Sequence, residues 1–268
     1  MTLSPTLDKL LAVLRRDLLI AIRYRSGFLL AAAGSCAELA AFYYLSRSVG
    51  PGFRPEGVEY FPFLLVGTGL YTFLLMGINA FLNTIEDGQR NGTLEVLMTT
   101  PTPPALLVVL SAISAFAASG VNFVLYLAAG LLLFGARLQV NVFGCLAILG
   151  LSLFLAVSFG LFAAALQLAI QKGSAVIWLL SSGMWFLTGT MFPVSSLPRG
   201  LHYLSTAIPI THALNGMRLA LLENAPLPLL GREIAILALF VLILLPASLS
   251  VFARTLRRAR LQGTLSFY

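Results

Sequence analysis

Long runs of apolar residues are the feature that most constrains how this chain can fold. Six runs, separated by short polar segments, cover about residues 26–46, 61–85, 104–135, 141–170, 174–193 and 233–253. A helix needs ~20 largely apolar residues to cross a bilayer, and continuous rather than alternating runs favour helices over a barrel. With 59% hydrophobic and 10% charged residues, the chain also differs strongly from a soluble domain. We therefore predict an all-α polytopic membrane protein with six transmembrane helices, folded as a single transmembrane domain over residues 1–268.

The segment before the first apolar run, residues 1–25, has the pattern of an amphipathic helix. Ser4-Pro5 supplies a helix start, and leucines then recur at helical spacing. Lys9, Arg16 and Arg23 share the opposite face. Because such a helix lies along the membrane interface with its arginines toward the lipid headgroups, we predict an N-terminal interfacial helix that contacts membrane lipid.

The segment between the fifth and sixth runs, residues 194–232, is interrupted by prolines. Pro198, Pro209 and Pro226 divide it into pieces of roughly 10 and 15 residues, each too short to span a bilayer. Both pieces carry apolar positions at helical spacing, which indicates two half-helices that enter the membrane and return. Non-helical backbone at that depth must be buried in protein or line a wet cavity. We predict an extracytoplasmic re-entrant helical hairpin.

The basic residues indicate the orientation of the chain. If the N-terminus is cytoplasmic, 11 of the 17 Lys and Arg residues fall in cytoplasmic segments and 6 fall outside. Cytoplasmic segments of membrane proteins carry the excess of Lys and Arg, so we predict that both termini are cytoplasmic. Since these residues lie beside the apolar runs, the net charge of +7 indicates contact with anionic lipid rather than with nucleic acid. Residues 86–101 then form a cytoplasmic loop between the second and third runs.

This loop is compact and polar, and it ends in a short helical pattern. Glu86 and Arg90, four residues apart, can pair across one helical turn. Asn91-Gly92 favours a turn with positive φ, and Thr93 can cap the helix that follows. A helix of this length needs a groove to hold it in water, either in its own protein or in a partner. Its apolar face consists of only Leu94, Leu97 and Met98.

The loop resembles the coupling loop of the ABC type-2 transporter permease family. In that family an acidic residue, an arginine and a Gly-Thr-x-Glu element precede a helix that docks into an ATPase subunit. The matching residues here are Glu86, Arg90, Gly92-Thr93-Leu94-Glu95, Leu97 and Pro101. Two later stretches resemble the re-entrant hairpin of the same family, Phe192–Pro198 and Pro209–Arg218. The resemblance covers the whole chain, with its elements in family order.

The resemblance implies which residues carry each function. The ATPase-coupling residues would be Glu86, Asp87, Arg90, Gly92, Thr93, Leu94, Glu95, Leu97, Met98 and Pro101. The residues of the hairpin or gate would be Pro193, Leu197, Pro198, Pro209, Thr211 and Arg218.

The resemblance also implies a function, that of the transmembrane permease subunit of an ATP-driven exporter in the bacterial cytoplasmic (inner) membrane. Two ABC ATPase subunits would bind the coupling helices of residues 93–100. A second permease, either a second copy in a homodimer or a sister chain, would complete the translocation path. The expected substrate is an amphiphile: a lipid-linked glycan or polysaccharide, a lipid, or a hydrophobic drug.

The chain has no G-x-x-x-x-G-K-[ST] phosphate loop. ATP and Mg would therefore be bound by the partner ATPase, and this chain would bind no cofactor and would not itself be an enzyme. Two other functions remain as alternatives. One is an intramembrane enzyme such as a prenyl-protein protease, because Glu86-Asp87 followed by Arg90 resembles the start of its motif, one residue short of E-E-x-x-x-R. The other is a secondary transporter, although no inverted repeat is present.

A few polar residues lie within or beside the apolar runs. Glu38, about a dozen residues into the first run, is a costly intramembrane carboxylate that either joins a polar network or faces the translocation path. Gln167 is expected to form a hydrogen bond between helices. No metal site is expected, because neither the two cysteines nor the two histidines have the spacing of metal ligands.

Overall fold

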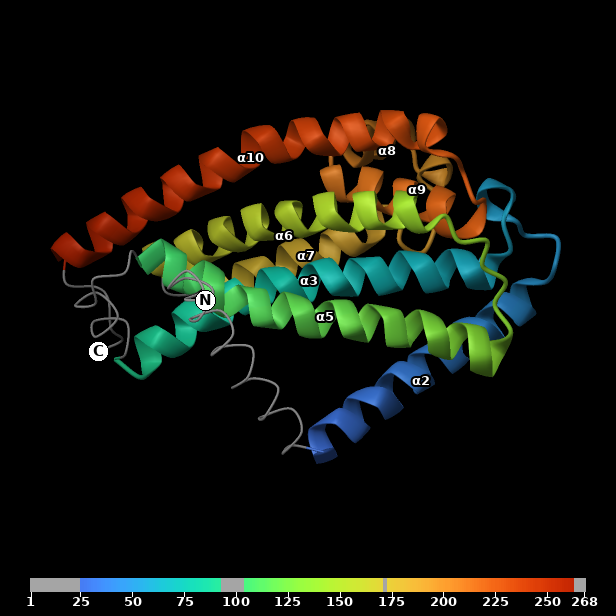
Figure 1. The fold of residues 1–268 in the computed structure, drawn as a ribbon, viewed down its shortest axis with the longest axis horizontal. Helices are drawn as coiled ribbons and strands as arrows, with labels where there is room; N and C mark the ends of the chain where they lie inside the picture. The colour runs from blue at the N-terminus through green and yellow to red at the C-terminus, as the bar shows by residue number, and fades with distance from the viewer. Residues whose placement is uncertain (1–24, 93–103, 171–172, 263–268) are drawn as a thin grey trace, which may run out of the picture.

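The computed structural model describes residues 25–92, 104–170 and 173–262, and every regular element in them is a helix. This confirms the all-α prediction for the described part of the chain. The predicted interfacial helix falls almost wholly in residues 1–24, outside the described residues. In chain order the elements are α2 (Arg25–Val49), the short helix η1 (Pro55–Gly57), α3 (Tyr60–Arg90), α5 (Pro104–Phe134), α6 (Val142–Ile170), α7 (Gly173–Leu187), the short helix η2 (Val194–Ser196), α8 (Arg199–Thr206), α9 (Pro209–Leu222) and α10 (Leu227–Gln262) (Figure 1).

Four helices in the described residues are long and apolar enough to cross a membrane. They are Leu29–Val49 of α2, Tyr60–Arg90, Val142–Ile170 and Leu227–Gln262. Two shorter apolar helical stretches are Ala118–Phe134, within the 31-residue α5, and the 15-residue α7. The chain is therefore a multi-pass membrane protein by the length and composition of its helices. The count of six spans and the orientation of the termini stay predictions.

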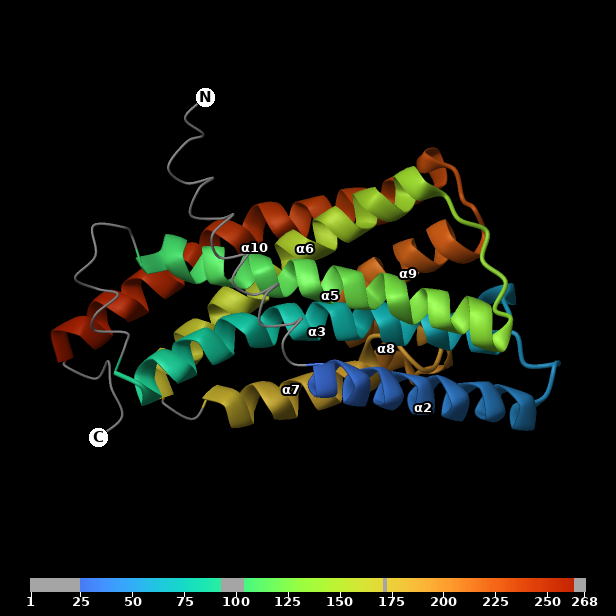
Figure 2. The ribbon, with the colours of Figure 1, turned by 60° about the horizontal axis from the view of Figure 1, so that its bottom comes forward.

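α3 lies at the centre of the bundle. It contacts α2, α5, α6, α7 and α9, and most of its length is buried. In Figure 2, α2 and α7 lie on one side of α3, and α6 and α10 lie on the other. α3, α6 and α10 all begin at one end of the bundle, which we call the Tyr60 end (Figure 1). We call the opposite end the Arg90 end.

The core of the bundle is built from aromatic rings set over glycines. The ring of Phe116 on α5 lies where a side chain on Gly77 would stand, and the ring of Phe81 does the same at Gly160 on α6. Phe116 and Phe81 are themselves in contact, with their centroids 6.1 Å apart. Helices in a membrane associate through close van der Waals contact rather than through the hydrophobic effect, and small residues allow that approach. These glycines therefore set how closely α5 and α6 approach α3.

The outer helices expose apolar surface. α2 and α10 are mostly unburied along their apolar stretches. Among the exposed side chains are Leu30 on α2, Trp178 and Leu179 on α7, and Leu242 on α10. Surface of this kind on a membrane protein faces lipid tails or the helix of another subunit.

The segment between α7 and α10 is broken at its prolines. α7 ends at Leu187, six residues before the predicted end of the fifth span at residue 193. α8, α9 and α10 then begin one residue after Pro198, at Pro209 and one residue after Pro226. α9 is almost entirely buried, and it packs against α3, α6 and α10 at the Tyr60 end. Two successive helices therefore exist here, while their re-entrant depth in the bilayer stays a prediction.

We expect Gly160→Ala to lower the stability of the protein, because the added Cβ meets the buried ring of Phe81. The cost of overpacking a well-filled site is about 1–3 kcal/mol. Gly150→Ala on the same helix is the matched control, because a Cβ there meets nothing within 4 Å and alanine favours the helix. Thermal unfolding of the two purified variants measures the difference. Equal unfolding midpoints would contradict this account of the packing.

Candidate functional site

The first five residues of the predicted coupling loop, 86–90, continue α3 and form its end rather than a loop. The predicted pair forms: Arg90 Nη2 donates to Glu86 Oε1 at 2.5 Å. The helix ends at Arg90, where Asn91 N–H donates to the carbonyl of Asp87, and Gly92 has the positive φ of +66° expected of the turn. The coupling role of these residues stays a prediction. Outside the described residues lie Thr93, Leu94, Glu95, Leu97, Met98 and Pro101.

Two buried glutamines connect this end of α3 to its neighbours. Gln89 and Gln167 are each 1% exposed, and Gln167 Nε2 donates to Gln89 Oε1 at 3.2 Å. Gln167 Oε1 in turn accepts the backbone N–H of Ser174, at the start of α7. The expected interhelical bond of Gln167 is therefore confirmed. Through it the last turn of α3 is attached to the end of α6 and to the start of α7.

At the Tyr60 end, Arg218 of α9 is buried against the other end of α3. Its side chain is 4% exposed, and its Nη2 donates to the carbonyls of Gly189 at 2.8 Å and Thr190 at 3.1 Å. Its guanidinium carbon lies 3.5 Å from the centroid of the Phe63 ring. A side chain at Gly67 would collide with the guanidinium, so glycine is required there. Arg218 thus joins α9 to α3 and to the turn that follows α7.

No carboxylate within the described residues forms an ion pair with Arg218. Its charge is met instead by carbonyl dipoles and by the face of the Phe63 ring. Burial lowers the pKa of Arg218 to about 10, so the side chain is cationic at neutral pH. Its Nε and Nη1 have no hydrogen-bond partner in the described structure. A buried, incompletely bonded charge is costly, so the contacts that Arg218 does make must offset this cost, and its role in a gate stays a prediction.

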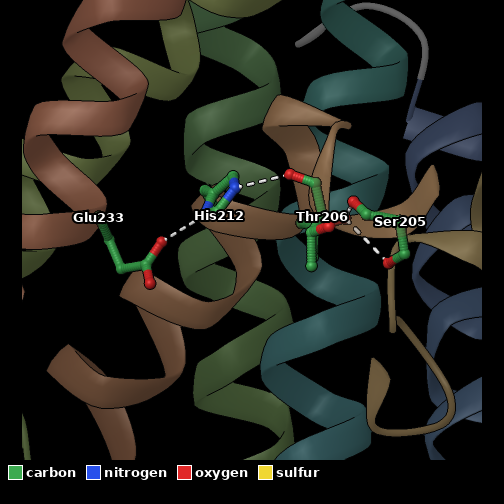
Figure 3. A network of polar contacts seen from close by, with 5 residues as sticks. Ser205, Thr206, His212 and Glu233 are labelled. Atoms are coloured by element: carbon green, nitrogen blue, oxygen red, sulfur yellow. Dashed lines mark hydrogen bonds and ion pairs between the residues drawn. The ribbon is translucent and has the colours of Figure 1, made fainter. Parts of the chain in front are cut away.

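A second polar contact holds α9 to α10 and to α8. His212 Nδ1 lies 2.6 Å from Glu233 Oε2, and His212 Nε2 lies 3.0 Å from the carbonyl oxygen of Thr206 (Figure 3). Thr211 Oγ1 donates to the carbonyl of Ser205 at 2.8 Å, which closes the junction between α8 and α9. The sequence offered no sign of the His212–Glu233 pair, because the two residues are 21 positions apart and separated by a helix break.

The remaining residues predicted for the hairpin lie at its bends. Pro193 precedes η2, and its carbonyl accepts the hydroxyl of Ser196 at 2.7 Å. Leu197 ends η2 and Pro198 caps α8, while Pro209 opens α9 in the first turn, where its missing N–H costs no hydrogen bond. These residues shape the chain, and only Thr211 and Arg218 of the predicted set make polar contacts to other helices or turns through their side chains.

Glu38 lies away from both ends, in a pocket of about 170 Å³ between α2, α3 and α5. Tyr126, Asn122 and Thr72 line the same pocket. Both interpretations of Glu38, a place in a polar network and a place facing the translocation path, stay predictions. In the described part of the chain, no group of three His, Cys, Asp or Glu side chains is placed to hold a metal ion.

These features define an all-helical, multi-pass membrane protein whose longest buried helix has a polar contact at each end. The sequence model of the ABC-2 type transporter family matches residues 8–222, which is well over half of the chain. The chain belongs to this family and is the membrane component of a transporter. The match includes the predicted coupling loop and α8–α9, and it ends where α9 ends. A comparison with curated proteins gave no match.

We expect the His212–Glu233 contact to stabilise the protein more at low pH than at high pH. The hydrogen bond to Glu233 is the largest cause that raises the pKa of His212 above its ordinary 6.5. The stabilisation is therefore complete below pH ~6.5 and is lost as pH rises through the higher folded-state value. Hydrogen bonds to charged groups contribute about 1.5–3 kcal/mol.

The measurement is thermal unfolding of wild type and Glu233→Gln from pH 5.5 to 8.5. The gap between their midpoints should shrink as pH rises. The matched control is Glu223→Gln, an exposed carboxylate on the same part of the chain with no ion pair in the described residues. A gap that stays constant or widens with pH would show that His212 is neutral in the fold.

Proposed function

We propose that this chain is the permease subunit of an ATP-driven exporter of the bacterial cytoplasmic membrane, coupled through residues 86–101 to a separate ABC ATPase. Membership of the ABC-2 type transporter family supports an ATPase partner. Two ATPase subunits and a second permease would complete the assembly, with ATP and Mg bound by the ATPase. In this proposal the Arg90 end of the bundle is cytoplasmic and α8–α9 form the gate at the opposite end.

One continuous helix carries this proposal. α3 runs for 31 residues from Tyr60 to Arg90, or ~46 Å at 1.5 Å per residue. Its first turns touch Arg218, and its last turn contains the Glu86–Arg90 pair. Closely packed interiors do not absorb a displacement locally, so a push on the Arg90 end of a buried helix is passed along it. α3 is therefore suited to transmit ATPase closure to α9.

An apolar pocket supports an amphiphilic substrate. It has a volume of about 500 Å³ and lies among α3, α6, α7 and α10. Its walls can accommodate an acyl or prenyl chain, because nearly all the side chains that line it are hydrocarbon. They include Ile78, Phe159, Phe162, Leu180, Met184 and Val251.

The exposed apolar faces of α2 and α7 support a second permease subunit. Leu29 and Leu30 on α2, and Trp178 and Leu179 on α7, are each more than half exposed in the single chain. A second copy that covered these faces would bury them as subunit interface, and the space between the copies would form the translocation path. The stoichiometry of the purified complex tests this arrangement together with the ATPase partner.

We expect a soluble protein with a phosphate loop to co-purify with this chain after gentle extraction from its native membrane, at one copy per permease copy. Scrambling residues 93–98 should abolish its recovery, because the proposed docking helix is destroyed. Scrambling the six residues 263–268 is the control of equal length. Mass spectrometry of the eluted complex reads out partner and stoichiometry. Transport by the chain purified alone would contradict the proposal and favour the secondary transporter.

We expect the double variant Glu86→Ala, Arg90→Ala to separate ATP hydrolysis from transport. An exposed (i, i+4) pair contributes only about 0.3–0.5 kcal/mol, so the protein should fold normally. In proteoliposomes that contain the partner ATPase, hydrolysis should stay within about twofold of wild type, while ATP-dependent movement of a headgroup-labelled lipid should fall at least tenfold.

The control for this experiment is Arg258→Ala, which removes an exposed arginine near the same end but outside the loop. It should leave both hydrolysis and transport near their wild-type rates. Full transport by the double variant would remove the coupling role assigned to Glu86 and Arg90. Loss of hydrolysis and transport together in the double variant would instead indicate failed docking of the ATPase.

A further inference from the structure

A polar pocket opens at the Tyr60 end, distinct from the contacts of Arg218 and from the apolar pocket. It has a volume of about 450 Å³ and lies where α2 and α5 end and α3 begins. Three arginines line it from three separate segments: Arg47 on α2, Arg54 in the loop before α3, and Arg137 after α5. Of the residues that line the pocket, Glu59 is the only acidic one.

The three arginines are not neutralised by the protein. Within the described residues, none of them forms an ion pair, whereas Arg90 at the other end pairs with Glu86. With Glu59 included, the lining carries a formal charge of 3 − 1 = +2. Like charges gathered around one concavity repel each other, and the low-dielectric wall strengthens the repulsion. An anion between them would relieve it.

One of the three arginines, Arg47, is held in place before any ligand binds. Arg47 donates from Nε and Nη2 to the hydroxyl of Tyr43, at 3.2 and 2.8 Å. The Tyr43 ring in turn contacts Phe61 and Phe134, with centroid distances of 5.6 and 5.3 Å. A side chain that is ordered beforehand loses less conformational entropy on binding, so the contacts of Arg47 with a ligand contribute more fully to affinity.

The loop that carries Arg54 contains two glycines with positive φ and one aromatic contact to α3. Its glycines Gly50 and Gly57 have φ values of +91° and +85°, which only glycine adopts without strain. Phe53 beside Arg54 packs edge-on against Tyr60, the first residue of α3, at 4.9 Å between centroids. Arg54 is thus presented from a defined turn.

We propose that this pocket binds the anionic group, phosphate or carboxylate, of an amphiphile. Guanidinium groups match the oxygens of phosphate and carboxylate with two parallel hydrogen bonds, and the surrounding rings offer faces for a glycerol or sugar unit. The volume fits a headgroup of that size. The neighbouring apolar side chains on α2, Tyr44, Leu45 and Val49, are exposed. The chains of an amphiphile can lie along them while its headgroup occupies the pocket.

The ligand has two possible sources with the same chemistry: an anionic phospholipid of the bilayer, or the anionic headgroup of the transported molecule. Binding at this pocket is independent of ATP coupling and of the direction of transport. It requires only that the pocket, at the ends of α2 and α5 and the start of α3, faces the headgroup region of a membrane.

The test compares two double variants that remove the same charge from the same end. Arg54→Gln, Arg137→Gln removes two arginines of the pocket, and Arg199→Gln, Arg232→Gln removes two exposed arginines outside it. Each protein is placed in nanodiscs of neutral phosphatidylcholine and titrated with dioctanoyl phosphatidic acid by calorimetry. The pocket variant should bind at least about tenfold more weakly than wild type, and the control within about twofold. The binding should weaken as salt rises.

Several outcomes would overturn the inference. Equal weakening in both double variants would show a diffuse attraction of the whole end rather than a site. Inorganic phosphate that competes as well as phosphatidic acid would show a site for a free anion. Unfolding midpoints of the variants are compared without ligand, and they should match wild type because Arg54 and Arg137 bond to no side chain in the described structure.

A second measurement distinguishes the two sources. Anionic amphiphiles that remain on the protein after purification from native membrane are extracted and identified by mass spectrometry. A phospholipid present on wild type and absent from the pocket variant identifies a bilayer lipid as the ligand. An anionic amphiphile of another class, lost in the same way, identifies the transported molecule. Identical extracts from the two proteins, together with equal affinity for phosphatidic acid, would overturn the proposal.

Discussion

Arg218 makes it possible for this protein to break its helices in an apolar setting. Where α7 stops at Leu187, the carbonyls of the following turn have no helical partners and need other hydrogen-bond donors. Arg218 supplies hydrogen bonds to two of those carbonyls. Its charge rests on the Phe63 ring of α3, beside a glycine that leaves room for it. The turn after α7, the buried helix α9 and the start of α3 are therefore held by one side chain.

The sequence predicted the features that follow from solvent and from backbone chemistry. The apolar runs predicted an all-helical membrane protein. Pro198, Pro209 and Pro226 predicted the breaks at which α8, α9 and α10 begin, because proline cannot continue a helix. The Glu86–Arg90 pair and the positive φ of Gly92 were predicted because both are local, set within four residues of the chain. Local rules need no knowledge of the tertiary fold.

Contacts between distant segments could not be predicted in this way. Glu233 and His212 meet across a helix break, Gln89 meets Gln167 across 78 positions, and Arg218 meets Phe63 across 155. No periodicity connects such pairs, because their meeting depends on how whole helices pack. In the sequence, the arginines of the polar pocket indicate only the orientation of the chain. Their convergence from three segments appears only when α2, α3 and α5 are placed together.

The polar pocket and the predicted coupling loop lie at opposite ends of the same helix, α3. Glu59, Tyr60 and Phe61 line the pocket at the start of α3, and Glu86 and Arg90 lie at its end. Suppose that the ligand binds the pocket more tightly when α3 is in one position than when it is in another, and so changes the affinity of a partner at the Arg90 end. Linkage then requires that the docked partner change the affinity of the ligand by the same factor. A rigid helix can therefore couple ligand binding in the pocket to partner binding at the opposite end of the bundle, without any contact between ligand and partner. The size of that effect is limited to the difference in affinity of the ligand for the two positions of α3.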